Sequence, residues 1–136
     1  MNISDLLVGD VMTIDPVVVE VDASLEFAAQ LLRENSISGL PVVDRRGSLI
    51  GVISQTDLVA VMGSRMSRLI RGEPCGLRVG ELMSSPAVTV PLTDSLNEAA
   101  RRMLDAHVHR LVATDDGGRP VGVLSAIDFV GLYADE

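Results

Sequence analysis

The second half of the chain repeats the first half. A shift of 71 residues aligns Val8–Val59 with Val79–Val130 without a gap, and 17 of the 52 aligned pairs are identical. Many other pairs exchange one apolar residue for another. Self-similarity at a fixed spacing indicates repeated structural units, and two copies are too few for a solenoid. The repeat therefore predicts two similar units related by a pseudo-two-fold axis.

Each copy begins with the pattern of a helical turn followed by a strand. The turns are expected around Asp5–Met12 and Val79–Met83. The strands are expected at the β-branched runs Val17–Val21 and Val88–Leu92, because β-branched residues favour a pleated backbone.

A helix is predicted next, because apolar residues recur at positions i, i+3, i+4 and i+7 of an amphipathic pattern. Ser24 and Ser95 precede the two helices and are placed to cap them, and Glu98 would complete a capping box in the second copy. The apolar positions are Leu25, Ala28, Ala29 and Leu32 in the first copy and Leu96, Ala99, Ala100 and Met103 in the second.

A pair of strands and a final helix complete each copy. Both copies place Asp and Gly between two apolar runs, which is the pattern of a β-hairpin. A helix then opens at Ser54 or Ser125. Each copy is therefore predicted to be a β-α-β-β-α unit. The hairpin strands are expected at Leu40–Val43 and Leu49–Ile53, and at Leu111–Thr114 and Pro120–Leu124.

The same pattern predicts how the chain is divided. Residues 1–71 form the first unit with its N-terminal segment and a long second helix, 72–78 form a linker, and 79–136 form the second unit. The apolar stripe Leu58–Ile70 of the long helix is interpreted as core first and as a dimer interface second. A basic edge of this helix, either solvated or facing a partner or phosphates, consists of Arg65, Arg68 and Arg71.

The two strand-to-helix junctions share a Gly-x-x-Ser-x-x-Asp motif, at Gly51–Asp57 and Gly122–Asp128. One interpretation is a capping box, in which the Ser accepts a backbone N–H three residues on and the Asp reaches back. The other is a ligand site, because a helix N-terminus offers N–H groups to an anion and an adjacent carboxylate can accept both hydroxyls of a ribose. The Gly would then let a ligand approach the strand. Both interpretations stay open at this point.

The segment before each hairpin is a second candidate. It reads Ile37-Ser38-Gly39-Leu40-Pro41 in the first copy and Val108-His109-Arg110-Leu111-Val112 in the second. Pro41 cannot donate to a ladder, so it is predicted at a sheet edge or a strand start. His109 and Arg110 either contact phosphates or belong to a solvated turn.

The composition excludes several functions. A net charge of −8 argues against a general nucleic-acid binder, because phosphate backbones attract an excess of Lys and Arg. No apolar run is long enough to span a bilayer, and the N-terminus lacks the order of a signal peptide. The single cysteine, Cys75, cannot form an internal disulfide. We therefore expect a cytoplasmic protein that binds neither nucleic acid nor membrane.

Patterns for catalysis or metal binding are scarce. His107 and His109 lie two residues apart, without a second cluster of ligands at metal spacing. Cys75 has no organised base in evidence, and the sequence contains no P-loop. The sequence therefore predicts no metal site, no obligatory cofactor and no enzymatic activity.

Both copies resemble CBS domains, first described in cystathionine β-synthase, and the tandem resembles a Bateman module. The resemblance covers about Leu7–Gly63 and Val79–Glu136 and rests on motifs that recur in the same order in both copies. It implies an α/β (α+β) fold of two pseudo-symmetric units, each β-α-β-β-α, packed sheet to sheet. It also implies a regulatory module that binds AMP, ADP, ATP, S-adenosylmethionine or a related adenosine ligand in the cleft between the repeats.

The resemblance also implies roles for individual residues. Asp57 and Asp128 would each hold a ribose, with Ser54 and Ser125 near the ribose or the phosphate. His109 and Arg110 resemble the phosphate-contacting segment of the energy-sensing members. The other implied nucleotide-binding positions are Thr56, the adenine walls Asp15, Pro16, Val17, Pro86, Ala87 and Val88, and the neighbouring Ile37, Gly39, Leu40, Pro41, Val108, Leu111 and Val112.

The two copies are not equivalent at these positions. Val112 stands where the first copy has Pro41, and Arg110 stands where it has Gly39, so one corner is expected to bind better than the other. Because CBS pairs commonly dimerise, the resemblance also implies a homodimer that acts in trans on an unidentified regulated protein. The alternative function is a ligand-free CBS dimer that serves as a protein interaction module.

Overall fold

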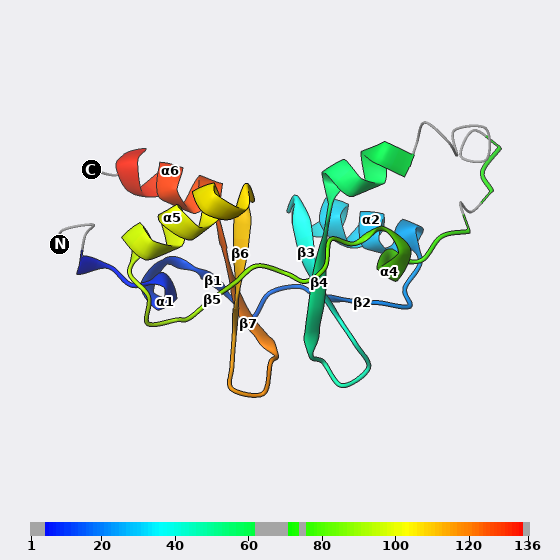
Figure 1. The fold of residues 1–136 in the computed structure, drawn as a ribbon. Helices are drawn as coiled ribbons and strands as arrows, with labels where there is room; N and C mark the ends of the chain where they lie inside the picture. The colour runs from blue at the N-terminus through cyan, green and yellow to red at the C-terminus, as the bar shows by residue number, and fades with distance from the viewer. Residues whose placement is uncertain (1–4, 62–70, 74–75, 135–136) are drawn as a thin grey trace. The chain divides into compact units, whose positions relative to one another are not determined.

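The computed structural model describes residues 5–61, 71–73 and 76–134 (Figure 1). The chain splits into two compact units. One, the Asp57 unit, comprises Val17–Pro86, and the other, the Asp128 unit, comprises Met1–Pro16 together with Ala87–Glu136. Each unit therefore joins the body of one repeat to the opening segment of the other repeat.

The opening segments are too short to bury a core of their own, and each packs into the unit to which it is joined. Val8 is 0% exposed in the core of the Asp128 unit, and its N–H donates to the carbonyl of Asp94 at 2.9 Å. Val79 is 0% exposed in the core of the Asp57 unit, and its N–H donates to the carbonyl of Ala23 at 2.9 Å. The compact units therefore cross the boundaries of the sequence repeats, and the division into 1–71, a 72–78 linker and 79–136 stays a prediction.

The Asp57 unit has the predicted strand–helix–strand–strand–helix order. Its elements are β2 (Val19–Glu20), α2 (Leu25–Asn35), β3 (Gly39–Val43), β4 (Leu49–Ser54), a helix over residues 55–61, and α4 (Val79–Leu82) from the opening segment of the second repeat. The strands form a sheet in the order β2-β3-β4. Strand β2 is parallel to β3, and β3 is antiparallel to β4.

The Asp128 unit repeats this order and adds an edge strand. Its elements are α1 (Val8–Val11), β1 (Thr13–Ile14), β5 (Thr89–Val90), α5 (Leu96–Ala106), β6 (Arg110–Thr114), β7 (Pro120–Ser125) and α6 (Ala126–Ala134). The sheet order is β1-β7-β6-β5. The sequence pattern did not predict β1, which pairs antiparallel with β7. Both units are β-α-β-β-α, so the predicted mixed fold of two similar units is confirmed.

Pro41 does not lie at a sheet edge or a strand start, contrary to the prediction, but inside the central strand β3. The reason is visible at its counterpart Val112, whose N–H donates to the carbonyl of Val88 at 3.0 Å. Proline cannot make that bond, and ladder pairing in the Asp57 unit starts one position later, at Val19 opposite Val42. The proline is therefore tolerated, and the two-residue parallel pair of the Asp57 unit begins one position later than that of the Asp128 unit.

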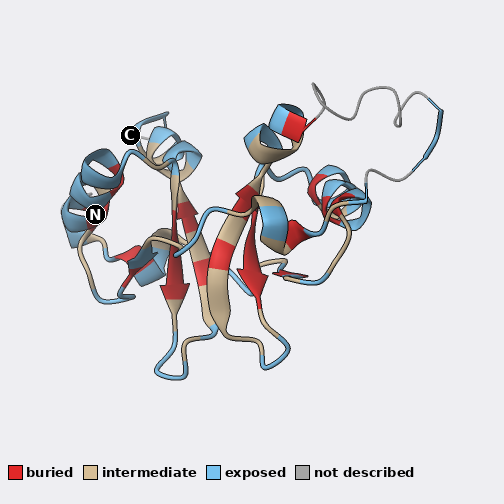
Figure 2. Ribbon diagram, turned by 45° about the vertical axis from the view of Figure 1, so that its right-hand side comes forward, coloured by how far each residue is buried: buried red, intermediate tan, exposed pale blue. Residues whose placement is uncertain are grey.

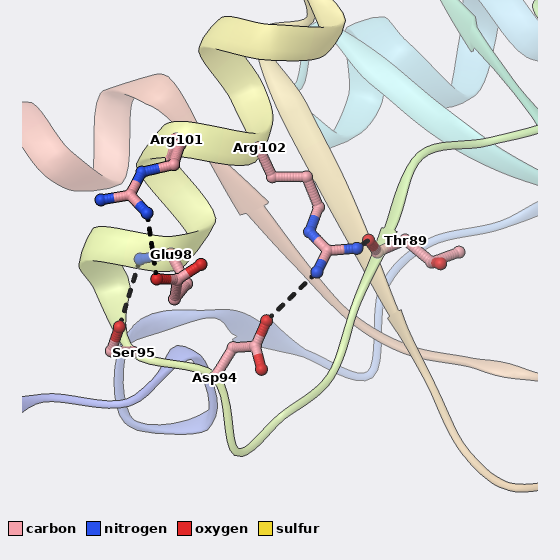
Figure 3. A network of polar contacts seen from close by, with 6 residues as sticks. All are labelled: Thr89, Asp94, Ser95, Glu98, Arg101 and Arg102. Atoms are coloured by element: carbon pink, nitrogen blue, oxygen red, sulfur yellow. Dashed lines mark hydrogen bonds and ion pairs between the residues drawn. The ribbon is translucent and has the colours of Figure 1, made fainter.

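The first helix of each repeat, α2 or α5, is capped as the sequence predicts. The hydroxyls of Ser24 and Ser95 each accept the backbone N–H three residues on, at 3.1 Å. Both helices end at a left-handed residue, Ser36 or His107, with φ of 53° and 55°. The carboxylate of Glu98 accepts from Arg101 at 3.4 Å (Figure 3). The serine part of the predicted capping box is therefore confirmed, while the Glu98 side chain contacts the next turn of its own helix.

The core of each unit combines one face of the sheet with the apolar face of α2 or α5 (Figure 2). Along β3, Leu40 and Val42 belong to the same buried cluster as Ala28 and Leu32 of α2. Because successive residues of a strand point to opposite faces, Gly39 and Pro41 lie on the other face of β3. Strand β6 repeats the alternation, with Leu111 and Ala113 in the core.

Much of the predicted long helix lies outside the described residues. Leu58 packs against the core, as predicted for the start of the apolar stripe, but residues 62–70, which hold Arg65 and Arg68, are not described. Arg71 is described, and it pairs with Glu73 at 3.0 Å. No helix within the described ranges combines the length and the apolar character needed to traverse a bilayer.

Candidate ligand-binding corners

Each unit has a corner where a strand runs directly into a helix, and the predicted Ser and Asp meet there. Ser54 ends β4 and Ser125 ends β7. Oδ2 of Asp57 accepts from the N–H of Ser54 at 2.7 Å and from its hydroxyl at 3.1 Å. Oδ2 of Asp128 accepts from the N–H and the hydroxyl of Ser125 at 2.8 and 3.1 Å. The full capping box is therefore confirmed at Ser54, whose hydroxyl also accepts the N–H of Asp57 at 3.4 Å, while at Ser125 the half in which the aspartate reaches back is confirmed.

The capping contacts use only one oxygen of each carboxylate. Within residues 5–61, 71–73 and 76–134, Oδ1 of Asp57 and Oδ1 of Asp128 accept no hydrogen bond, and both side chains belong to half-buried residues. An ionised carboxylate has about four acceptor positions, of which Oδ2 uses two. The two acceptor positions that remain on Oδ1 match the two hydroxyl donors of a vicinal diol. Capping and ligand binding are therefore compatible at both corners.

The structure brings the second predicted segment to the same corners. Gly39 lies opposite Ser54 in the β3–β4 pair, and Arg110 lies opposite Ser125 in the β6–β7 pair. The residue before Gly39 or Arg110 also contacts the start of the helix: the carbonyl of His109 accepts the N–H of Ala126 at 2.9 Å. Ser38 makes the same contact with Gln55 at 2.9 Å. The two motifs, 15 residues apart in each repeat, therefore form one site in each unit.

The motif glycines do not leave room for a ligand, contrary to the prediction. A Cβ on Gly51 would lie 2.7 Å from the carbonyl oxygen of Ser84 and 2.8 Å from Sδ of Met83. A Cβ on Gly122 would collide with Sδ of Met12. The space above each glycine is therefore filled by the methionine of the opening segment that packs on that strand. The glycine is therefore required by this packing.

The other predicted contact residues occupy varied positions. Leu40 and Leu111 are each 0% exposed and belong to the cores, so they are not accessible to a ligand. Val112 is also buried, on the opposite face of its strand. Ile37 is 37% exposed. The remaining members are the buried Pro41, the half-buried Gly39 and Val108, and the exposed Thr56 and His109.

The predicted adenine walls lie where the chain passes from one unit to the other. Asp15 and Pro16 belong to the Asp128 unit, while Val17 begins the Asp57 unit. Pro86 and Ala87 stand at the second crossing, and Val88 packs against the core of the Asp128 unit. The N–H of Asp15 donates to Val121 at 3.3 Å, with φ of 49° at Asp15. The role of these residues as adenine walls stays a prediction.

A polar cluster that the sequence did not predict joins β5 to α5 in the Asp128 unit. The guanidinium of Arg102 donates to the carbonyl of Thr89 at 3.2 Å and to the carboxylate of Asp94 at 3.4 Å (Figure 3). This arginine ties β5, the strand that follows Val88, to the middle of α5. Its counterpart in the first repeat is Leu31, an apolar residue packed against the core. A charged residue at the matched position was the available signal.

Metal-ligand clusters are not found in the part of the chain that the structure describes. No group of three or more His, Cys, Asp and Glu residues there is arranged to hold a metal ion. His107 is the exposed C-cap residue of α5, and His109 precedes β6. Cys75 lies outside the described residues.

Comparison with models of protein families identifies the family of this chain. The sequence model of the CBS domain matches residues 8–64 and again 79–135. The chain belongs to the CBS domain family. The two matches correspond to the two sequence repeats, and the arrangement is that of a CBS pair, or Bateman module.

Several known proteins are similar to this chain over most of its length. The chain is 26% identical to the uncharacterized protein MJ1426 of Methanocaldococcus jannaschii, over 92% of this chain and 89% of the relative. It is 30% identical to the chloroplastic CBS domain-containing protein CBSX2 of Arabidopsis thaliana, over 87% of this chain but only 59% of that protein. A homoserine O-acetyltransferase from Methanosalsum zhilinae is 24% identical, and the match spans 23% of its length. A sequence similar to this chain therefore also occurs as a small part of a larger protein.

Solved structures of CBS pairs share the fold. CBSX2 in complex with AMP superposes with a TM-score of 0.78 at 34% identity, covering 95% of this chain and 96% of that one. The CBS domain of a CBS domain-containing membrane protein from Sphaerobacter thermophilus superposes with a TM-score of 0.78 at 27% identity, covering 96% and 89%. CBSX2 is one of the matched structures that contain a bound adenosine compound.

Proposed function

We propose that this CBS pair is a ligand-sensing module that binds adenosine-type ligands, of the AMP, ADP, ATP or S-adenosylmethionine class, at its two Ser-Asp corners. The observation that carries the proposal is the arrangement of the carboxylates. In each unit Oδ2 is held by the serine N–H and hydroxyl, while Oδ1 accepts no bond within the described residues. A carboxylate fixed before binding loses little freedom when it accepts a ribose diol, so it contributes more to affinity.

The neighbouring groups suit the rest of a nucleotide. Arg110 and His109, beside the Ser125 corner, offer donors to phosphate oxygens, and arginine can do so with two parallel bonds. Ser54 and Ser125 stand at helix starts, where an anion is favoured. CBSX2, a relative with 34% identity, binds AMP. This relative supports an adenosine ligand for the present chain without deciding the number of phosphates.

We further propose that the module regulates a partner protein in trans, without catalysis, and that it does so as a homodimer. Exposed apolar residues on the helices that follow the corners support a dimer. They are Val59 at 63% exposure, Ile127 at 70%, Val130 at 57% and Tyr133 at 71%. The three of these residues on α6 are spaced three apart and form an apolar stripe that a second copy of the chain can cover. The cytoplasmic location stays a prediction.

The ligand proposal is tested by calorimetry with AMP, ATP, S-adenosylmethionine and NAD. Asp57→Ala and Asp128→Ala should each weaken binding at their own corner by about 10- to 150-fold, because a hydrogen bond to a charged group contributes about 1.5–3 kcal/mol. The double variant should bind none of the four. The proposal is rejected if the wild type binds none of the four or if both variants bind as the wild type does.

The hairpin turns supply matched controls for these variants. Oδ1 of Asp44 accepts the N–H groups of Arg46 and Ser48 at 2.9 and 3.0 Å, and Asp115 makes the same pair of contacts in the second repeat. These aspartates also hold backbone N–H groups, but they follow the opposite ends of β3 and β6. Asp44→Ala and Asp115→Ala should lower stability and leave the affinity for nucleotide unchanged.

The second candidate function is a ligand-free interaction module. The exposed apolar residues of α6 favour it independently of the corners. If it is correct, AMP will not raise the melting temperature, because a ligand stabilises a protein only by binding its folded state. Ile127→Asp would then reduce self-association measured by analytical ultracentrifugation, and an unaltered sedimentation profile would argue against the dimer.

A further inference from the structure

The two corners have the same main chain. In both, the residue two positions before Leu40 or Leu111 accepts an N–H from the start of the helix that follows the corner: Ser38 from Gln55 and His109 from Ala126, each at 2.9 Å. In both, the serine at the strand end gives its N–H and its hydroxyl to Oδ2 of the aspartate. Differences in ligand choice between the corners must therefore come from side chains and not from the backbone.

The side chains differ in charge next to the serine. Residues directly opposite each other in an antiparallel pair project on the same face of the sheet, with Cβ atoms about 4.5–5.5 Å apart. Arg110 lies opposite Ser125 and is half-buried, so its side chain leaves the sheet on the face that carries the Ser125 hydroxyl. Gly39 occupies this position opposite Ser54 and brings no side chain. The residues before them differ as well, because His109 stands where the first repeat has Ser38.

This difference changes the charge that a phosphate meets. A 5′ phosphate on a ribose held by Asp57 or Asp128 lies within the Debye length of about 8 Å from that carboxylate, so repulsion is only partly screened. At the Ser125 corner, Arg110 brings a positive charge to the sheet face that carries Ser125. At the Ser54 corner, the segment Ser38-Gly39 brings no positive charge to balance Asp57.

We infer that the two corners select adenosine ligands by the charge at the 5′ end. The Asp128 corner takes a ligand with a 5′ phosphate, and the Asp57 corner takes an adenosine whose 5′ end carries no negative charge. The inference rests on the proposed function and adds to it that the pair binds two ligand classes at once, a nucleotide and a nucleoside. A module of this kind reports the balance between phosphorylated and unphosphorylated adenosine compounds.

The experiment isolates each corner and exchanges the two side chains that distinguish them. Asp57→Ala leaves the Asp128 corner, and Asp128→Ala leaves the Asp57 corner. In each background, calorimetry measures the affinity for AMP and for adenosine. We expect AMP to bind the Asp128 corner at least tenfold more tightly than adenosine does. At the Asp57 corner we expect adenosine to bind at least as tightly as AMP.

Arg110→Gly should abolish the AMP preference of the Asp128 corner while changing adenosine affinity less than twofold. Gly39→Arg should create an AMP preference at the Asp57 corner. Arg110→Lys should retain part of the preference, since it keeps the charge and loses the bidentate geometry. Arg110→Gln removes the charge without adding a glycine to β6, so it replaces Arg110→Gly if circular dichroism shows that the glycine variant is unfolded.

The possible outcomes separate the inference from the proposed function. If neither AMP nor adenosine binds the wild type, both are rejected. If both ligands bind but Arg110→Gly and Arg110→Gln weaken them equally, ligand binding stands and charge selection is overturned. A preference of the Asp57 corner for AMP would also overturn it. Raising the salt concentration should reduce the AMP preference at the Asp128 corner and leave adenosine binding unchanged.

Discussion

Replacing Val8 by alanine should loosen the Asp128 unit, although Val8 belongs to the first repeat in sequence. Val8 is 0% exposed and lies in the core that contains Leu96, Ala99 and Met103. Removing two methyl groups costs about 1.6 kcal/mol in transfer free energy. Incomplete collapse of the cavity raises the loss in the free energy of unfolding to about 3 kcal/mol at most. The result should be a local destabilisation confined to the unit that Val8 completes.

Hydrogen exchange of backbone amides is the assay, because it reports the opening of each unit separately. A loss of about 1.6–3 kcal/mol accelerates exchange through local opening by about 15- to 150-fold. In Val8→Ala this acceleration should occur in α5, β6 and β7. In the mirror variant Val79→Ala it should occur in α2, β3 and β4, because Val79 is 0% exposed in the core of the Asp57 unit.

The same assay can refute the reasoning. Faster exchange of α2 and β3 in Val8→Ala, with α5 and β6 unchanged, would mean that each opening segment packs on its own repeat. Val18→Ala is the surface control, since Val18 is 37% exposed. It should change exchange far less than either core variant.

Three further predictions concern single residues. Gly122→Ala should lower the free energy of unfolding by about 1–3 kcal/mol through collision with Met12, and the loss measured in denaturant should shrink in the double variant with Met12→Ala. Pro41→Val should extend the parallel pair by one residue, so the new amide at position 41 should be protected from exchange like that of Val112, whose bond is 3.0 Å; an unprotected amide would contradict our explanation of the late start of β2. Ser95→Ala should cost about 1 kcal/mol by removing the helix cap, visible as a lower melting temperature, and an unchanged temperature would show that the cap contributes nothing.

Local features of the fold could be predicted from the sequence because their causes are local. The apolar spacing from Leu25 to Leu32 and the serine before it suffice for a capped helix. The spacing of three residues between Ser54 and Asp57 likewise suffices for the corner, because the bonds from serine to Oδ2 span only one helical turn. These contacts join residues that are near each other in the chain, so the pattern of residues alone predicts them.

The outcome at the glycines and at Pro41 required the tertiary structure. Gly51 and Gly122 read equally well as places for a ligand or for another segment, and only the packed methionines decide between them. Pro41 has a strand pattern around it, and only the pairing on both sides of β3 shows which single bond it forfeits. In each case the deciding contact comes from a segment far away in the sequence.

What the sequence by itself determined is the repeat, the order of elements within it and the two Ser-Asp corners. What only the tertiary structure decided is which opening segment completes which unit. The pairs Val8-Gly9 and Val79-Gly80 are identical, so either segment has the residues to fill either core. A choice between two nearly identical docking partners depends on contacts between distant parts of the chain, and no local pattern records it.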